Sequence, residues 1–128
     1  MPEGLTPTSV PAFDAQISYI VRTYSLRGID VLSHCRGGVG RASIVAGSWA
    51  IKMGLIQPKG LSPSSSPEER DFKEVESVIA VLRRRRSLKA IETYEQVRWM
   101  MEYVQWLRVE GGVVRCAAEG GTGFRREC

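Results

Sequence analysis

One β-type run, Ile29-Asp30-Val31-Leu32-Ser33, stands among four segments of helical periodicity, and this imbalance constrains the fold more than any other feature. A lone strand does not form a stable sheet, because its backbone donors and acceptors need neighbouring strands. Two interpretations are open: the neighbouring strands lie outside this chain, or the fold is of another kind. We favour the first, and predict an α/β fold in which 29–33 is a central strand and the upstream strands are missing.

The helical segments carry start and stop signals. Proline is tolerated in the first turn of a helix, glycine ends helices, and a Ser/Thr-x-x-Glu/Gln pattern predicts a capping box. The stretch 55–67 is rich in Pro, Ser and Gly, which predicts a surface loop. Four helices are predicted. The first begins at Ser9-Val10-Pro11 and stops at Gly28, and the second covers Ala42 to Met53. The third and fourth begin at the capping boxes Ser66-Pro67-Glu68-Glu69 and Thr93-Tyr94-Glu95-Gln96.

Size and composition indicate one globular domain. The chain has 128 residues, 43% of them hydrophobic and 25% charged, and no apolar run reaches the length of a membrane span. Met1 to Pro11 has no basic region followed by an apolar one, so no secretory signal is visible. Cysteines at 35, 116 and 128 form no paired framework, and the lone His34 builds no metal cluster. A reducing compartment, the cytoplasm with the nucleus as the alternative, fits best.

The net charge of +4 predicts affinity for anions without choosing one. Much of it comes from the runs Arg83–Arg86 and Arg125–Arg126. The four-arginine run is either a nuclear-localisation or nucleic-acid patch, or the solvated end of a helix, where cations meet the negative end of the dipole. We favour the helix end, and expect neither a nucleic-acid nor a membrane partner.

Five residues, three of them glycine, separate Cys35 from Arg41 between the β-type run and a helix. Backbone N–H groups converging at a helix N-terminus cradle a phosphate dianion, and glycines let the backbone approach it. The same field favours a nucleophilic thiolate at Cys35. Arg41 offers a planar, two-pronged donor to two phosphoryl oxygens, which lysine does not. A buried cysteine beside an ordinary turn explains this coincidence poorly.

The segment His34-Cys35-Arg36-Gly37-Gly38-Val39-Gly40-Arg41 resembles the signature loop of the protein tyrosine phosphatase superfamily, in its dual-specificity branch. Downstream, Ala90-Ile91-Glu92-Thr93-Tyr94-Glu95-Gln96 resembles a segment of small atypical dual-specificity phosphatases and kinase-associated phosphatases. The resemblance covers roughly Pro2 to Leu107. Low-molecular-weight phosphatases and arsenate reductases share the Cys-to-Arg spacing, but place it near their N-terminus and lack the second segment.

This resemblance implies a partial catalytic domain over 1–110 and leaves 111–128 as a flexible tail. Its implied roles are a nucleophile, Cys35, a phosphate clamp, Arg41, and a general acid, Glu3, in the segment Pro2 to Pro7. For Glu3 a solvated terminal charge is an equal alternative. The loop residues implied to bind the substrate phosphate are Arg36, Gly37, Gly38, Val39, Gly40 and Arg41.

Two departures from the family pattern stand out. Ala42 replaces the usual Ser or Thr that supports the cysteine sulfur as a leaving group, and Ser43 is the neighbouring hydroxyl that would have to replace it. The strands that precede the acid loop in the family are also missing, so the sequence resembles the C-terminal half of such a domain. We therefore expect this polypeptide alone to be poorly folded and nearly inactive.

Three supporting roles follow from the same resemblance. His34 hydrogen-bonds within the loop, and Gln96 either positions the hydrolytic water or closes its capping box, the latter being favoured. Arg83 or Arg86 buttresses the loop, and the sequence does not distinguish them.

The implied function is a metal-free, cofactor-free protein phosphatase that hydrolyses phosphotyrosine through a cysteinyl-phosphate, with phosphoserine and phosphothreonine as further substrates. The alternatives are a phosphatase for a phosphoinositide or an RNA 5′-phosphate, and a truncated, non-catalytic phospho-binding module. Gly38 and Val39 add no cation to the loop, which favours a phosphoprotein as the partner. The oligomeric state is not indicated.

Overall fold

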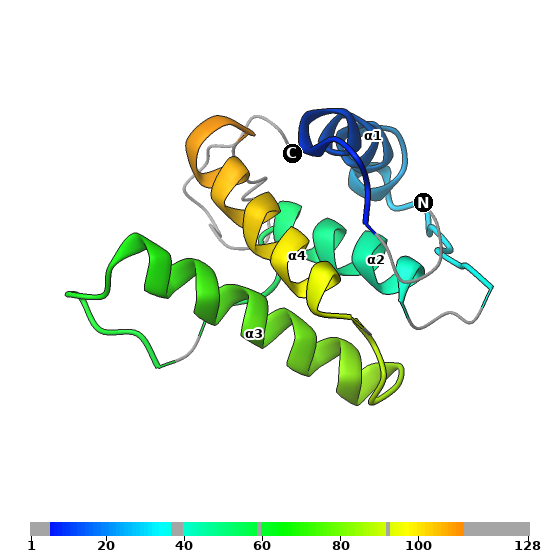
Figure 1. The fold of residues 1–128 in the computed structure, drawn as a ribbon. Helices are drawn as coiled ribbons and strands as arrows, with labels where there is room; N and C mark the ends of the chain where they lie inside the picture. The colour runs from blue at the N-terminus through cyan, green and yellow to red at the C-terminus, as the bar shows by residue number, and fades with distance from the viewer. Residues whose placement is uncertain (1–5, 37–39, 59, 92, 112–128) are drawn as a thin grey trace.

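The computed structural model describes residues 6–36, 40–58, 60–91 and 93–111 (Figure 1). Helices dominate these residues, and Figure 1 shows α4 passing in front of α2, with α3 below them and α1 above. The elements are α1 (Val10–Thr23), a 3-10 turn η1 (Ser25–Arg27), α2 (Arg41–Lys52), α3 (Pro67–Arg85), α4 (Tyr94–Trp106) and a π-helical turn η2 (Leu107–Gly111).

The predicted α/β fold with a central strand is wrong. No strand occurs in the described ranges, and 29–33 runs as irregular chain. A strand is stabilised by its neighbours, and without a second strand this run has no ladder to join. Its apolar side chains are also exposed, Val31 to 48% and Leu32 to 86%, whereas a central strand is buried on both faces. The premise of a half-sheet that awaits upstream strands is therefore not met in the described residues, and the expected poor folding of the chain stays a prediction.

The helix starts follow the capping signals. Ser9 accepts a hydrogen bond from the backbone N–H of Ala12 at 3.3 Å, and Ser66 accepts one from Glu69 at 3.1 Å. Thr93 forms the full capping box with Gln96: each side chain accepts a hydrogen bond from the other residue's backbone N–H, at 3.2 and 3.3 Å. Caps of this kind contribute about 1 kcal/mol each. The three predicted helix starts are confirmed. The tail predicted over 111–128 lies outside the described residues apart from Gly111, which ends η2.

The helices share one core between α1, α2, α3 and α4. Phe13 of α1 meets Trp99 of α4 edge-on at 4.7 Å, and Trp99 stacks on Tyr103 at 5.3 Å. Such aromatic pairs contribute beyond the area they bury. The amphipathic faces read from the sequence therefore cover one another instead of covering a sheet. The buried hydrophobic members are Phe13, Ile17, Val21, Ile44, Ile51, Val75, Val78, Ile91, Trp99, Met100, Tyr103, Val104 and Leu107.

A buried ion pair ties three helices together. Lys52 of α2 lies 3.2 Å from the carboxylate of Asp14 in α1, and both side chains are less than a tenth exposed. The hydroxyl of Tyr103 in α4 donates a 2.6 Å hydrogen bond to the same carboxylate. Burial and this carboxylate raise the pKa of Tyr103 far above its usual value, so the hydroxyl stays protonated and remains a donor. This network fixes α1 against α2 and α4.

Contacts at two points along α2 show in which direction α3 and α4 run relative to it. A Cβ at Gly47 would lie 3.0 Å from Met100 of α4, 3.1 Å from Val78 and 3.3 Å from Leu82 of α3. Glycine therefore permits the close crossing at this point. Further along α2, Ile51 shares a cavity with the beginning of α3 and the end of α4. Thus α3 is antiparallel to α2, and α4 is parallel to it.

It follows that the beginning of α2, the end of α3 and the beginning of α4 share one end of the bundle, on the right in Figure 1. None of the described helices is long and apolar enough to cross a bilayer.

Candidate active site

The loop that carries Cys35 and Arg41 is closed at its base. Ser33, two residues before the cysteine, donates a hydrogen bond from its hydroxyl to the backbone carbonyl of Ala42 at 3.2 Å. Ala42 follows Arg41 in the first turn of α2. The chain entering the loop and the chain leaving it are therefore fastened together. This closure brings the two main predicted site residues into one short loop at the beginning of α2.

The beginning of α2 has no side-chain cap. Its N-cap is Gly40, which provides no side-chain cap, and its first turn holds no acidic residue. The other three α-helices are each capped by a hydroxyl, from Ser9, Ser66 and Thr93. The first backbone N–H groups of any helix lack intrahelical partners and form the positive end of its dipole. An anion held by the loop would therefore meet these donors directly.

The predicted site residues differ in exposure. The thiol of Cys35 is of intermediate burial, and Arg41, the first residue of α2, is also partly buried. His34 and Arg36 are exposed, and Gly40 is buried. Two of the phosphate-binding glycines and the valine of the loop, Gly37, Gly38 and Val39, lie outside the described residues.

The two residues after Arg41 face into the protein. Ala42 is 7% exposed and Ser43 is 3% exposed. Ala42 provides the carbonyl that closes the loop, and its methyl group supplies no hydroxyl for a leaving sulfur. The nearest hydroxyls along the chain are those of Ser33 and Ser43.

Gln96 lies at the site end of the bundle and is fully buried. Its side-chain oxygen accepts the backbone N–H of Thr93, so the capping role that the sequence favoured is confirmed. A role in positioning water stays a prediction. Glu3, the predicted general acid, lies outside the described residues. Shortly after it, residues 6–8 line a cavity of about 200 Å³ together with one face of α4 from Glu95 to Glu102.

Arg83 buttresses the second motif. Its guanidinium donates to the carbonyl of Ala90 at 3.1 Å and to that of Ile91 at 3.3 Å. Ile91 is buried and has φ of 59°, which is an unfavourable backbone conformation for a β-branched residue. Such strain costs on the order of 1–3 kcal/mol and persists only where surrounding contacts hold it. Arg83, one of the two candidates, thus holds the segment 90–91, and these two hydrogen bonds do not reach the loop 34–41, so the buttressing of that loop by Arg83 or Arg86 stays a prediction.

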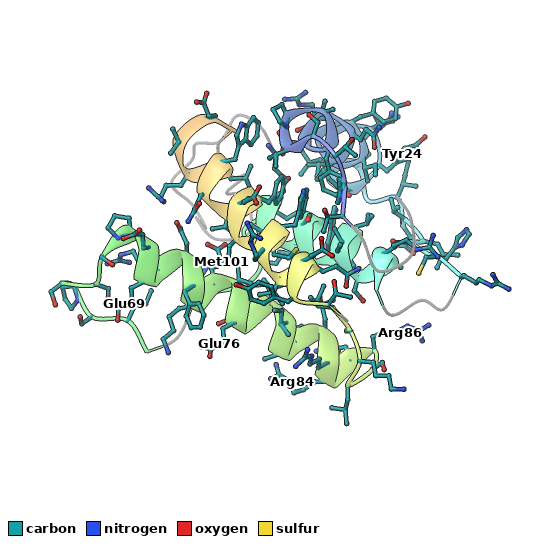
Figure 2. The ribbon with its side chains drawn as sticks, in the orientation of Figure 1. Tyr24, Glu69, Glu76, Arg84, Arg86 and Met101 are labelled. Carbon is teal, nitrogen blue, oxygen red and sulfur yellow. The ribbon has the colours of Figure 1, made fainter. Side chains whose placement is uncertain are left out.

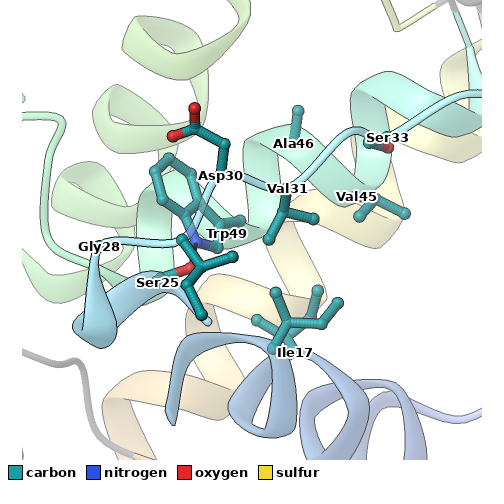
Figure 3. A pocket seen from close by; sticks show the side chains of 11 residues that line it. Ile17, Ser25, Gly28, Asp30, Val31, Ser33, Val45, Ala46 and Trp49 are labelled. Carbon is teal, nitrogen blue, oxygen red and sulfur yellow. Dashed lines mark hydrogen bonds between the residues drawn. The ribbon is translucent and has the colours of Figure 1, made fainter. Parts of the chain in front are cut away.

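A hollow of about 510 Å³ lies beside the segment that leads into the loop (Figure 3). Ile17 of α1, Trp49 of α2 and Val31 line it, and Trp49 donates a hydrogen bond to Ser25 at 2.8 Å. Cys35 and Arg41 are not among its lining residues. Ser33, which closes the loop, does line it, so this apolar hollow adjoins the base of the loop without including Cys35 or Arg41.

The sequence predicts a supporting role for Arg83 or Arg86 but not the contacts of Arg83. Those contacts depend on the turn at 87–91, which brings two backbone carbonyls back to α3. The positive φ of Ile91 had no signal, because isoleucine is rare in that conformation. No group of three or more His, Cys, Asp or Glu side chains in the described ranges is placed to hold a metal ion.

Comparisons with known proteins give no relative: no family model, no curated protein and no solved structure matches the chain.

Proposed function

We propose that the chain is a cysteine-dependent phosphatase that hydrolyses phosphotyrosine in proteins, with phosphoserine and phosphothreonine as further substrates. The observation that carries the proposal is the closed loop at the uncapped beginning of α2, with Cys35 near its entrance and Arg41 at its exit. The Cys-to-Arg spacing and the three intervening glycines are the sequence features in its support.

In this mechanism the phosphate dianion is held by the backbone N–H groups of the loop and by the guanidinium of Arg41. The thiolate of Cys35 attacks phosphorus, and a phosphorus–sulfur bond forms as the bond to the substrate oxygen breaks. The departing oxygen takes a proton from a general acid, for which Glu3 is the candidate. Water then attacks phosphorus and gives a proton to the carboxylate that acted as the acid, the phosphorus–sulfur bond breaks, inorganic phosphate leaves, and the thiolate of Cys35 is restored.

The second step has an unusual feature in this chain. The sulfur must leave from the cysteinyl-phosphate, and Ala42 offers no hydroxyl to support it. Ser33 and Ser43 are the hydroxyls closest along the chain, and Ser33 already donates to a carbonyl. We therefore infer that breakdown of the intermediate limits turnover. A reducing compartment, the cytoplasm or the nucleus, would keep the thiol active.

The test is turnover of a chromogenic aryl phosphate by the protein and by two variants. Cys35→Ser should abolish turnover. The same variant should still bind a phosphotyrosyl peptide, because the loop amides and Arg41 remain. Arg22→Ala, an exposed arginine in the last turn of α1, serves as a control for loss of one charge and should leave turnover unchanged. Wild-type turnover in Cys35→Ser would remove the cysteine as nucleophile.

A further inference from the structure

A cavity of about 200 Å³ lies between the residues that lead into α1 and one face of α4. Residues 6–8 and Val10 line one side of it. The other side is lined by four residues at the spacing of a single helix face, Glu95, Arg98, Trp99 and Glu102. None of the lining residues belongs to the candidate phosphate site, so this cavity is a separate feature of the molecule.

The indole of Trp99 carries a buried donor without a partner. The residue is 4% exposed, and its Nε1 has no hydrogen-bond acceptor among the described residues. Phe13 packs edge-on against this ring at 4.7 Å, and Tyr103 stacks on it at 5.3 Å. The cavity is the polar space that the indole borders. Buried polar groups are nearly always hydrogen-bonded, so an orphaned N–H beside a cavity points to an acceptor that binds there.

The α4 side of the cavity also carries three charged groups. Glu95, Arg98 and Glu102 are exposed, and none of them forms an ion pair within the described part of the chain. Carboxylates accept hydrogen bonds, whereas a guanidinium and an indole N–H donate them. The cavity therefore offers acceptors to a cationic group and donors to an oxygen within a short length of one helix.

We propose that this cavity binds a small molecule in which an ammonium group stands next to a carbonyl or carboxylate oxygen, as in a free α-amino acid or at the N-terminus of a peptide. The ammonium would pair with Glu95 or Glu102, which flank Trp99 along α4. The oxygen would accept from the indole N–H, and Arg98 would add a second donor. This binding is independent of the proposed phosphatase activity.

The size and charge of the cavity limit the occupant. Drug-sized ligands occupy pockets of about 300–1,000 Å³. The 200 Å³ found here corresponds to roughly six or seven water molecules by their share of the liquid. A single amino acid or a chain end suits this volume better than a nucleotide does. A simple anion is disfavoured as well, because it would meet two carboxylates and only one guanidinium.

The experiment follows the indole N–H signals of the isotope-labelled protein by NMR while L-alanine is added. The chain has three tryptophans, and Trp99→Phe identifies the signal of Trp99. If that variant does not fold, Trp49→Phe and Trp106→Phe identify the same signal by elimination. The Trp99 signal should move downfield as its N–H gains an acceptor, with a Kd on the order of 1 mM for a ligand this small. The Trp49 signal should stay in place, because Trp49 already donates to Ser25 at 2.8 Å.

Two relatives of alanine define the recognised groups. N-Acetyl-L-alanine lacks the ammonium and should leave the Trp99 signal unchanged. L-Alaninamide keeps the ammonium and a carbonyl oxygen, as the N-terminus of a peptide does. Affinity for alaninamide equal to that for alanine would support the proposal with a peptide N-terminus as the source of the ligand, and weaker affinity would support it with a free amino acid.

Charge variants test the role of the two glutamates. Glu95→Gln/Glu102→Gln should weaken alanine binding about fivefold, the upper range for loss of an exposed ion pair. Glu68→Gln/Glu69→Gln removes the same charge from exposed positions at the beginning of α3, where Figure 2 shows Glu69, and should leave the affinity unchanged. A Trp99 signal that does not move at alanine concentrations far above that Kd would overturn the inference. So would an equal shift with N-acetyl-L-alanine, or wild-type affinity in Glu95→Gln/Glu102→Gln.

Discussion

Asp14→Asn tests the buried ion pair that joins α1, α2 and α4. The substitution keeps the shape of the side chain and an oxygen that can accept from Tyr103, but it removes the charge that faces Lys52. Lys52 is 7% exposed as a side chain, so its ammonium would stay buried without a counter-charge. Removal of one partner from a buried pair costs about 3–5 kcal/mol. For a domain of this size, that loss lowers the Tm by roughly 12–20 °C.

The assay is thermal and urea unfolding followed by far-ultraviolet circular dichroism, with turnover measured in parallel. Asp71→Asn is the matched control, because Asp71 is buried while its partner Arg108 is 42% exposed and can move into water. Its Tm should fall much less. Asp14→Asn/Lys52→Met removes both charges and should recover most of the stability. The reasoning fails if Asp14→Asn is no less stable than Asp71→Asn, or if the double variant is as unstable as Asp14→Asn alone.

Three further outcomes are expected. Arg41→Lys should lose most turnover of the aryl phosphate despite its charge, because a point cation makes no two-pronged contact, and a mild loss would exclude Arg41 as the clamp. Stopped-flow traces should show a burst of product followed by a slower steady rate, and Ala42→Ser should speed the slow phase; traces without a burst that Ala42→Ser leaves unchanged would mean that another group assists the leaving sulfur. Arg83→Ala removes two hydrogen bonds that hold the strained Ile91, and urea unfolding should show a loss of about 1–3 kcal/mol; an unchanged midpoint would contradict the buttress.

The helix starts could be predicted because their causes are local. Each capping hydroxyl meets an N–H three residues away, as Ser66 meets Glu69, so the pattern is complete within one turn of sequence. The strand over 29–33 could not be predicted in the same way. Its residues have strand preference, but a strand exists only where a second one pairs with it. In the described residues this run is instead an exposed, irregular segment that follows η1, while the helices bury their apolar faces against one another.

In the candidate site, too, local features could be predicted from the sequence and long-range contacts could not. The Cys35-to-Arg41 spacing is readable from the chain, and closure by Ser33 and Ala42 follows over only nine residues. The arginines of α3 reach this end of the bundle through the antiparallel packing of α2 and α3, which no local pattern specifies. The Lys52–Asp14 pair, separated by 38 residues, is likewise a consequence of the assembled core.

The central claim is that the phosphoryl group is transferred to the sulfur of Cys35 before it reaches water. Trapping this cysteinyl-phosphate intermediate tests the claim most directly. The protein is mixed with an aryl phosphate, quenched in acid during the slow phase, digested and examined by mass spectrometry. Slow breakdown of the intermediate predicts a phosphoryl group on the peptide that contains Cys35, and none on the same peptide from Cys35→Ser. Steady turnover with no phosphoryl group on that peptide, or with the group on another residue, would contradict the account.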